Sequence, residues 1–297
     1  MSNVLTDLSA ALAQTVADAG AGVVRVEGRR RIPATGIVWS ADGTILTAHH
    51  VVSRDEGIQI GLPDGRSVAA TLVGRDPSTD LAVLKAEAAD LTPFTEANKQ
   101  DVAVGHFVLA LGRPGKTVQA TLGIISALGD GWRTMRGGQI DRYLQTDVVM
   151  YPGFSGGPLV NASGHLVGLN TSHLAQGVSL TIPTSTLARV ADSLLAHGRV
   201  KRGYLGVSTQ RARLPENLRG ELGQKSGLMI VSVEADSPAE NGGLTMGDTI
   251  LAVADTAVHH HEDLLSQLTG DRVGTAVPIK ILRGGKVQTL DVTIGER

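Results

Sequence analysis

The segment Gly153-Phe154-Ser155-Gly156-Gly157 has the composition that nucleophilic chemistry at a serine requires. A nucleophilic serine must display its hydroxyl on a tight turn, and flanking glycines permit such a turn. It also needs backbone N–H groups nearby to stabilise a developing oxyanion, and Gly153 and Ser155 are placed to supply them. Taken alone, the segment would be interpreted as a glycine-rich hairpin turn, so its meaning depends on the residues that accompany it.

Two other segments carry residues that would activate such a serine. A histidine pair, His49 and His50, follows one β-branched run, and Asp80 directly precedes another. Each of these residues is more often structural when it stands alone. Together they give the chain order histidine, aspartate, serine at positions 50, 80 and 155, which suits a protein of two barrels. The first barrel would then provide a base and an orienting acid, and the second barrel the nucleophile.

Two further motifs carry weaker signals. The segment Gly112–Thr117 resembles a phosphate-binding loop, but such a loop must lead into a helix, and the sequence after it stays rich in β-branched residues. The run His259-His260-His261 contains metal-binding side chains. However, three consecutive residues cannot all face one ion, and no acidic residue or cysteine is spaced to complete a site. A solvated turn before a helix is the favoured interpretation, and we expect no cofactor and no metal.

The composition of the 297 residues limits the possible functions. At ~150 residues per domain, this length favours two domains. The formal net charge is −2, and the only dense basic run is Arg29-Arg30-Arg31, which disfavours nucleic acid as a partner. The absence of cysteine excludes disulfides, thiolate catalysis and thiolate metal sites. The 37 glycines among 297 residues are a larger share than the usual ~7 %, which indicates many tight turns.

Short β-branched runs separated by turn motifs extend from Val23 to about Pro183. Because no helical pattern separates them, they favour antiparallel barrels or a sandwich over a parallel sheet. Apolar residues at helical spacing predict an amphipathic helix before Gly20 and a second helix over Thr184–His197, which ends at Gly198. The expected strands are Val23–Val26, Gly36–Trp39, Thr44–Thr47, Ile58–Leu62, Val68–Val73, Leu81–Leu84, Val108–Leu111, Ala120–Ser126, Leu159–Val160, Leu166–Leu169 and Val178–Ile182.

A second, mixed α+β domain is expected after a polar linker at residues 199–202. A short helix is predicted near Glu262–Leu268. The expected strands of this domain are Tyr204–Ser208, Leu228–Val233, Thr249–Val253, Ala276–Leu282 and Val287–Ile294. We therefore expect one domain over residues 1–198, with its helix within residues 1–20, and another over residues 203–297.

The N-terminal segment lacks the features of a secretory signal. Its first arginine is Arg25, and Asp7, Gln14 and Asp18 interrupt its apolar residues. No run reaches the ~18 apolar residues of a membrane span. These features predict a cytoplasmic protein if Met1 is the native start, and an exported or periplasmic one if a leader was removed.

The chain resembles the trypsin-fold serine proteases of the HtrA/Deg family over essentially its whole length. Besides the segments above, it shares with that family the motifs Asp42–Thr47, Leu144–Asp147 and His197–Val200. The resemblance implies a mainly β fold, with a trypsin-like double six-stranded β-barrel followed by a small α+β PDZ domain. It implies His50 as general base, Asp80 as the acid that orients His50 Nδ1, and Ser155 as nucleophile. The N–H groups of Gly153 and Ser155 would form the oxyanion hole.

The resemblance also implies a substrate pocket and a peptide-binding groove. The pocket residues are Val149, Met150, Tyr151, Asn170, Thr171, Ser172, Leu180 and Ile182. None of them is acidic, so cleavage should follow small or medium aliphatic residues rather than Arg or Lys. Gly203–Val207 resembles the carboxylate-binding loop of PDZ domains, which hold a C-terminal peptide as an added strand. The residues of that groove are Tyr204, Leu205, Gly206, Val207, Leu264, Leu265 and Leu268.

Two features depart from the family pattern. The family usually has asparagine before the nucleophile, where this chain has Phe154, which has the bulk to alter how the oxyanion turn is held. The long loop between the first two strands is reduced to Gly28–Pro33, and the aromatic residues that usually join an N-terminal trimer are missing before Trp39. A homotrimer therefore rests on the resemblance alone.

The resemblance implies a serine endopeptidase that degrades unfolded or damaged proteins, in protein quality control and the stress response. Its PDZ domain would bind C-terminal peptide tails and regulate the protease. The glycine-rich stretch Gly129–Gly138, with Arg133 and Arg136, would relay that binding to the oxyanion turn. The alternative is a proteolytically weak chaperone or peptide-binding scaffold, which Phe154 and the apolar groove favour.

Overall fold

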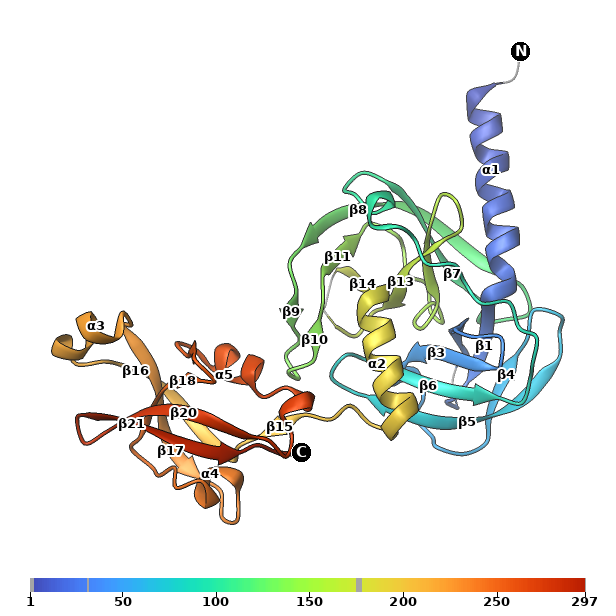
Figure 1. Ribbon diagram of the computed structural model, residues 1–297. Coiled ribbons are helices and arrows are strands. Elements are labelled where there is room, and N and C mark those ends of the chain that lie inside the picture. Colours follow the sequence, from blue (N-terminus) through green and yellow to red (C-terminus); the bar gives the residue numbers. More distant parts are fainter. Residues whose placement is uncertain (1–2, 31, 175–177, 297) are drawn as a thin grey trace. The chain divides into compact units, whose positions relative to one another are not determined.

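The computed structural model describes residues 3–30, 32–174 and 178–296, so Met1 and the Arg31 of the basic run lie outside the described residues. The chain divides into two compact units, Met1–Val200 and Lys201–Arg297 (Figure 1). Hydrophobic clusters of the first unit and of the second are separate. The division falls within the expected linker at residues 199–202.

The first unit contains two closed barrels of six antiparallel strands each (Figure 1). The strand order is β1-β2-β3-β6-β5-β4 in the first barrel and β11-β14-β13-β12-β7-β8 in the second. The first barrel consists of β1 (Val23–Glu27), β2 (Ala34–Val38), β3 (Thr44–Ala48), β4 (Ile58–Gly61), β5 (Ser67–Asp76) and β6 (Leu81–Ala86). The second consists of β7 (Phe107–Gly112), β8 (Gln119–Gly129), β11 (Tyr143–Thr146), β12 (Pro158–Asn161), β13 (Leu166–Thr171) and β14 (Ser179–Pro183). The expected double barrel is confirmed.

One barrel strand and a small hairpin were not expected from the sequence. The strand β11 closes the second barrel by pairing with β8 on one side and β14 on the other. The strands β9 (Trp132–Arg133) and β10 (Gln139–Ile140) form a two-stranded sheet in the segment between β8 and β11. The expected glycine-rich relay stretch therefore contains ordered pairing.

Two helices frame the barrels. The helix α1 (Val4–Ala19) begins at Asn3, whose side chain accepts a hydrogen bond from the Leu5 N–H at 3.1 Å. The helix α2 (Thr184–His197) ends at Gly198, which adopts the left-handed φ of 69° that glycine permits. The helix α2 follows the last strand of the second barrel, but its apolar face packs into the core of the first barrel. It therefore connects the two barrels. Among the described helices, none has the length and apolar character needed to cross a bilayer.

The second unit is a small α+β domain built around one antiparallel sheet. Its strand order is β16-β17-β18-β20-β21, with β19 beside β18 and a separate pair formed by β15 and β22. The strands are β15 (Gly203–Tyr204), β16 (Val207–Arg213), β17 (Ser226–Val233), β18 (Thr249–Val253), β19 (Thr256–Ala257), β20 (Ala276–Arg283), β21 (Lys286–Thr293) and β22 (Gly295–Glu296). The helices are α3 (Glu216–Leu222) and α4 (Pro238–Asn241), neither of which was expected, and α5 (His261–Gln267).

Candidate active site

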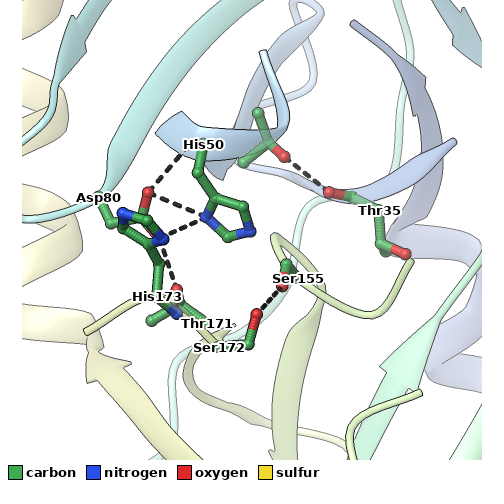
Figure 2. A network of polar contacts seen from close by, with 8 residues as sticks. Thr35, His50, Asp80, Ser155, Thr171, Ser172 and His173 are labelled. Atoms are coloured by element: carbon green, nitrogen blue, oxygen red, sulfur yellow. Dashed lines mark hydrogen bonds and ion pairs between the residues drawn. The ribbon is translucent and has the colours of Figure 1, made fainter. Parts of the chain in front are cut away.

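His50 and Asp80 meet because their strands are neighbours in the first barrel. His50 lies in a short 3-10 helix, η2 (His49–Val51), directly after β3, and Asp80 directly precedes β6. The two strands pair with Ala48 opposite Leu81, which brings the side chains that follow and precede them together. His50 Nδ1 lies 2.8 Å from Asp80 Oδ2 and 3.1 Å from Oδ1 (Figure 2). The His50 backbone N–H also donates to Asp80 Oδ1, at 2.9 Å.

The Asp80 carboxylate is fully buried and well supplied with hydrogen bonds. Thr171 Oγ1, at the end of β13 in the second barrel, donates to Asp80 Oδ2 at 2.5 Å. Burial raises the pKa of this carboxyl, but the hydrogen bonds and charge of His50, with the bond from Thr171, bring the pKa below its usual value. Asp80 is therefore ionised at neutral pH. Its charge favours the His50 tautomer that carries a proton on Nδ1 and a free lone pair on Nε2.

His49 makes a different set of contacts. Its backbone N–H donates to the Asp80 backbone carbonyl at 2.9 Å. Its ring Nδ1 is buried and finds no hydrogen-bond partner among the described residues. Burial lowers the pKa of His49 and keeps the ring neutral at pH 7. Of the two adjacent histidines, only His50 is therefore bonded to the Asp80 carboxylate.

The turn before Ser155 holds two backbone N–H groups ready for an anion. The Phe154 N–H donates to the Tyr151 carbonyl at 3.0 Å, and Gly153 between them has a φ of 94°. A proline followed by a glycine of positive φ is typical of a type II turn. Within the described part of the chain, the N–H groups of Gly153 and Ser155 have no acceptor, whereas those of Phe154 and Gly156 do. These are the two donors expected from the sequence.

The Ser155 hydroxyl lies next to a second serine. Ser155 Oγ is 3.2 Å from Ser172 Oγ, and no hydrogen bond joins it to His50 in the part of the chain that the structure describes. Figure 2 shows the His50 ring between Asp80 and Ser155, with the nitrogen remote from Asp80 on the side of the serine. Proton transfer from Ser155 therefore requires its hydroxyl to exchange Ser172 for His50, and contacts of this kind often tighten only when substrate binds.

Phe154 anchors the serine turn in the core of the second barrel. Its side chain is fully buried in the cluster that includes Ile125 and Leu159. Its ring meets that of Tyr151 edge-on, with centroids 5.8 Å apart. Gly112 on β7 provides the room, because a β-carbon there would lie 2.5 Å from Phe154 Cδ1. The bulk of Phe154 is thus directed into the core, away from the open side of the turn.

The eight expected pocket residues divide into an exposed and a buried set. Val149 and Tyr151 are 56 % and 55 % exposed, Ser172 is also exposed, and Met150 is half-buried. The buried members are Asn170, Thr171, Leu180 and Ile182. The two polar residues of the buried set have partners within the fold. Asn170 donates to the Pro158 carbonyl, and Thr171 donates to the Asp80 carboxylate. The exposed set can contact a substrate, and the buried set supports it.

Two residues of the site were missed from the sequence. The His173 ring stacks on His50, with centroids 5.1 Å apart and an interplanar angle of 20°. Thr35 Oγ1 donates to the Gly153 carbonyl at 2.7 Å, and the Thr35 N–H donates to the Ser155 carbonyl at 3.3 Å. No local motif marks either residue, because each reaches the site through contacts with segments distant in the sequence.

The two weak motifs have structural roles. The segment Gly112–Thr117 connects β7 to β8, and so lacks the helix N-terminus that a phosphate loop requires. The Arg113 guanidinium is held by three backbone carbonyls, those of Gly20, Val23 and Lys116. The backbone N–H groups of His259 and His260 donate to Asp263 Oδ2, at 2.8 and 2.9 Å. The histidine run therefore caps the start of α5.

In the second unit, an edge strand and a helix lie on either side of the expected peptide groove. The strand β16 pairs with β17 on one side, and α5 contacts it. Thr209 Oγ1 on β16 lies 3.3 Å from Nδ1 of His261, the first residue of α5. Gly206 has a φ of 82°, and a β-carbon there would lie 2.3 Å from Ser237 Cβ. The loop before β16 thus requires glycine at Gly206.

The expected groove residues lie at different depths. Leu205 and Leu264 belong to the core of the second unit, with 1 % and 2 % exposure. Tyr204 is half-buried, as are Val207, Leu265 and Leu268, and Gly206 is buried. The N–H groups of Leu205 and Gly206 have no acceptor among the described residues. Two free donors beside an edge strand are suited to a terminal carboxylate. Thr209 lies in the segment Val207–Thr209, beside which the peptide strand is expected, whereas His261, which borders the same groove, was not expected.

Comparison with known proteins identifies both units. A family model described as a trypsin-like peptidase domain matches residues 34–169, and one described as a PDZ domain matches residues 203–294. A probable periplasmic serine endoprotease DegP-like of Pseudomonas fulva is 38 % identical over 267 residues, covering 88 % of this chain and 55 % of that protein. Its counterpart from a Marinomonas species is 37 % identical, covering 91 % and 58 %. The chain thus spans somewhat more than half the length of these curated relatives.

Solved structures match the chain over almost the whole of both molecules. The serine endoprotease from Yersinia pestis is 34 % identical with a TM-score of 0.79, covering 96 % of this chain and 98 % of that one. The HtrA-type protease AlgW with a decapeptide is 31 % identical with a TM-score of 0.79, covering 96 % and 98 %. These structures share both domains with the chain, in the same order.

Proposed function

Because the chain belongs to the family of HtrA-type serine proteases, we propose that it is a serine endopeptidase whose catalytic residues are His50, Asp80 and Ser155. One observation carries the proposal. An ionised, buried Asp80 orients the His50 ring beside a serine turn whose Gly153 and Ser155 N–H groups have no acceptor in the described part of the chain. We assign these two donors to the oxyanion hole.

The acylation step uses each of these groups once. His50 Nε2 accepts the proton of Ser155 Oγ as that oxygen attacks the scissile carbonyl. Asp80 stabilises the imidazolium that forms, and the Gly153 and Ser155 N–H groups donate to the oxyanion. The imidazolium then protonates the leaving nitrogen, the peptide C–N bond breaks, and an acyl ester remains on Ser155.

Hydrolysis of the ester repeats the sequence with water as the nucleophile. His50 accepts a proton from the water, whose oxygen attacks the ester carbonyl within the same oxyanion hole. Collapse of the second tetrahedral intermediate returns the proton to Ser155 Oγ and releases the acid product. The hydrogen bond between Ser155 and Ser172 can then form again.

Labelling with a fluorophosphonate tests the proposed function directly. An activated Ser155 hydroxyl displaces the leaving group at phosphorus and gives a covalent adduct. We expect a stoichiometric adduct on Ser155 in the folded chain and none in Ser155→Ala. A folded wild-type chain that forms no adduct would instead support the alternative, a proteolytically weak chaperone or peptide-binding scaffold.

We assign the second unit a role in binding C-terminal peptide tails, and unfolded or damaged proteins as substrates of the first. The N–H groups of Leu205 and Gly206, beside the edge strand β16, have no acceptor in the part of the chain that the structure describes, and this supports peptide binding. One solved relative is named as a complex with a decapeptide. Domains over residues 1–198 and 203–297 accord with the observed division at Val200. A homotrimer rests on family membership and is tested by light scattering.

The proposed location is the periplasm or another exported compartment. The curated relatives are named periplasmic serine endoproteases, which supports the exported alternative. The cytoplasmic interpretation of the sequence has no support from them. Fractionation of cells that express the native gene, with a cytoplasmic enzyme as marker, measures the location.

Cleavage is expected to follow small or medium aliphatic residues. The proposed pocket positions contain no carboxylate, so a basic side chain would enter without an ionic partner. Peptide mapping of digested casein should show most cuts after Val, Ala or Leu. A majority of cuts after Arg or Lys would contradict the pocket assignment.

A peptide bound to the second unit is expected to raise the rate of cleavage. The stretch Gly129–Gly138 is held close to Asp80 by a hydrogen bond. Thr134 Oγ1 donates, at 2.7 Å, to the carbonyl of Ser78, which lies two residues before Asp80. If this stretch has an ordered and a disordered state, a peptide can raise activity through it only by preferring the ordered state. A coupling of ~1–3 kcal/mol corresponds to roughly 5- to 150-fold activation. The measurement is the rate on a short substrate with saturating peptides that end in apolar residues.

Variants of the stretch test this route. We expect activation in the intact chain, none in a chain that ends at Val200, and a weakened response in Thr134→Val but not in Thr134→Ser. At least one of Arg133→Ala and Arg136→Ala should also respond less. Equal activation of all these variants would exclude the stretch, and binding without a change in rate would reduce the second unit to a tether.

A further inference from the structure

An open cavity of about 590 Å³ lies on the first barrel, outside the triad. Its lining residues are Arg29, Arg30, Ser53 and Arg54. Arg29 and Arg30 belong to the shortened loop between β1 and β2, and Ser53 and Arg54 follow η2. Three arginines around one cavity make it strongly positive, in a chain whose net charge is −2.

Two of the three guanidinium groups of the cavity are held in place by neutral backbone carbonyls. Arg29 Nε donates to the Ile32 carbonyl at 2.9 Å, and an Arg54 terminal nitrogen donates to the Glu27 carbonyl at 2.6 Å. In the described part of the chain, none of the three arginines Arg29, Arg30 and Arg54 forms an ion pair with a carboxylate. Since neutral carbonyls fix two of the guanidinium groups and leave their charge available, the cavity is prepared for an anion.

The carboxylates of Glu27 and Asp55, which are near the cavity in the sequence, are already paired with other arginines. Glu27 Oε1 lies 2.6 Å from a terminal nitrogen of Arg25. Asp55, which follows Arg54, pairs with Arg75. The chain therefore supplies no carboxylate of its own to the cavity from these positions. A ligand that brings a carboxylate meets three guanidinium groups and, among the described lining residues, no acidic side chain.

The loop that carries Arg29 and Arg30 reaches from the proposed base to the proposed oxyanion turn. At one end of the loop, the Gly28 carbonyl accepts a hydrogen bond of 2.9 Å from the N–H of Ser53, which lies three residues after His50. At the other end, a β-carbon on Gly153 would lie 2.8 Å from the Pro33 carbonyl oxygen. The cavity therefore lies along the edge of the active site that joins His50 to Gly153.

If the acyl half of a substrate lies in the proposed pocket, its leaving half points toward this edge. The proposed pocket for the acyl half adjoins Ser155 through Ser172, whose Oγ is 3.2 Å from Ser155 Oγ. The β1–β2 loop and the start of β2 contact the opposite side of the turn, through Pro33 and Thr35. An extended substrate that places its acyl half near Ser172 must therefore direct its leaving half toward the arginine cavity.

We propose that Arg29, Arg30 and Arg54 bind acidic side chains of the substrate within the first few residues after the scissile bond. This inference rests on the proposed protease function and names a substrate class for it, namely segments with Asp or Glu following the cleaved bond. Charge attraction at an exposed site contributes modestly for each pair and falls with salt. With two or three guanidinium groups acting together, we expect about a tenfold preference for acidic over neutral leaving halves at low salt.

The test uses peptides that differ only after the cleaved bond. Quenched fluorescent peptides share an acyl half ending in Val and carry Glu, Gln or Lys at the second to fourth positions after it. Their C-termini are amidated, so that the carboxylate-binding loop of the second unit does not compete. We expect kcat/KM to be about tenfold higher for the Glu peptide than for the Gln peptide, lowest for the Lys peptide, and nearly equal for all at high salt.

Matched variants assign the preference to the cavity. The triple variant Arg29→Gln, Arg30→Gln, Arg54→Gln should cleave the Glu peptide no faster than the Gln peptide, while its rate on the Gln peptide stays that of the wild type. Arg66→Gln is the control, because Arg66 is an exposed arginine of the same barrel that lines no part of the cavity. Equal wild-type rates for Glu and Gln, or a preference that survives in the triple variant, would overturn the proposal.

Binding to Ser155→Ala separates this proposal from the proposed function. The Glu and Gln peptides, fluorescently labelled, are titrated with Ser155→Ala and with the same variant lacking the three arginines. Tighter binding of the Glu peptide that depends on the arginines supports the cavity site, even if the wild-type chain cleaves no peptide and the protease function fails. Equal binding of the two peptides refutes the cavity site, whatever the cleavage assay shows.

Discussion

Ser155→Ala is expected to lower kcat for the cleavage of casein by on the order of 10⁶, the loss typical of removing a triad serine. Alanine leaves no nucleophile, while the Gly153 and Ser155 backbone donors and the His50–Asp80 pair stay in place. Only a small rate over that in water should remain, from binding and from the oxyanion donors. Release of acid-soluble peptides from labelled casein measures the loss.

Two controls accompany this variant. The thermal midpoint should stay close to that of the wild type, because among the described residues Ser155 Oγ is hydrogen-bonded to Ser172 alone, at an exposed position. Binding of a C-terminal peptide should also be unchanged, since the groove lies in the separate second unit. Residual cleavage above about one per cent of the wild-type rate, far more than a lost triad serine allows, would place the nucleophile elsewhere.

The barrels were largely predictable because most of their strands are marked locally. β-branched runs and turn motifs such as Pro63-Asp64-Gly65 recur along the first unit, and these mark the strands on both sides of each turn. The strand β11 was not predicted from the sequence, because Tyr143–Thr146 is short and mixes polar with apolar residues. Its strand character comes from pairing with β8 and β14, which are distant along the chain. Pairing of this kind is a tertiary effect that no local pattern contains.

The candidate triad was predictable for a similar reason, whereas its surroundings were not. Each proposed triad residue stands in a motif of its own, so the motifs and their order carried the assignment. Thr35 and His173 reach the site across the fold and have no local signal. Phe154 has the bulk to disturb the oxyanion turn, but the structure shows that Gly112 on a neighbouring strand leaves the space it fills. A substitution that is unusual in sequence can thus be compensated by a residue known only from packing.

The adjacent histidines provide an internal control for the proposed mechanism. They share a short helical turn, but only the His50 ring is bonded to the ionised Asp80 carboxylate. The His49 ring is half-buried, and burial lowers its pKa, so it is neutral at pH 7. Substituting either histidine removes an imidazole from the same turn. The two substitutions remove the same side chain from the same turn but affect the proposed chemistry very differently.

His50→Ala is expected to reduce kcat by on the order of 10⁶, as Ser155→Ala does, because residues that act as one unit fail together. His49→Ala should keep kcat within about tenfold of the wild type, since its ring takes no part in proton transfer. The double variant His50→Ala, Ser155→Ala should be no slower than either single variant. Casein cleavage and fluorophosphonate labelling are measured for all of them, with thermal midpoints to exclude misfolding. If His49→Ala is the inactive variant and His50→Ala retains activity, the general base is His49, and the bond between His50 and Asp80 is structural.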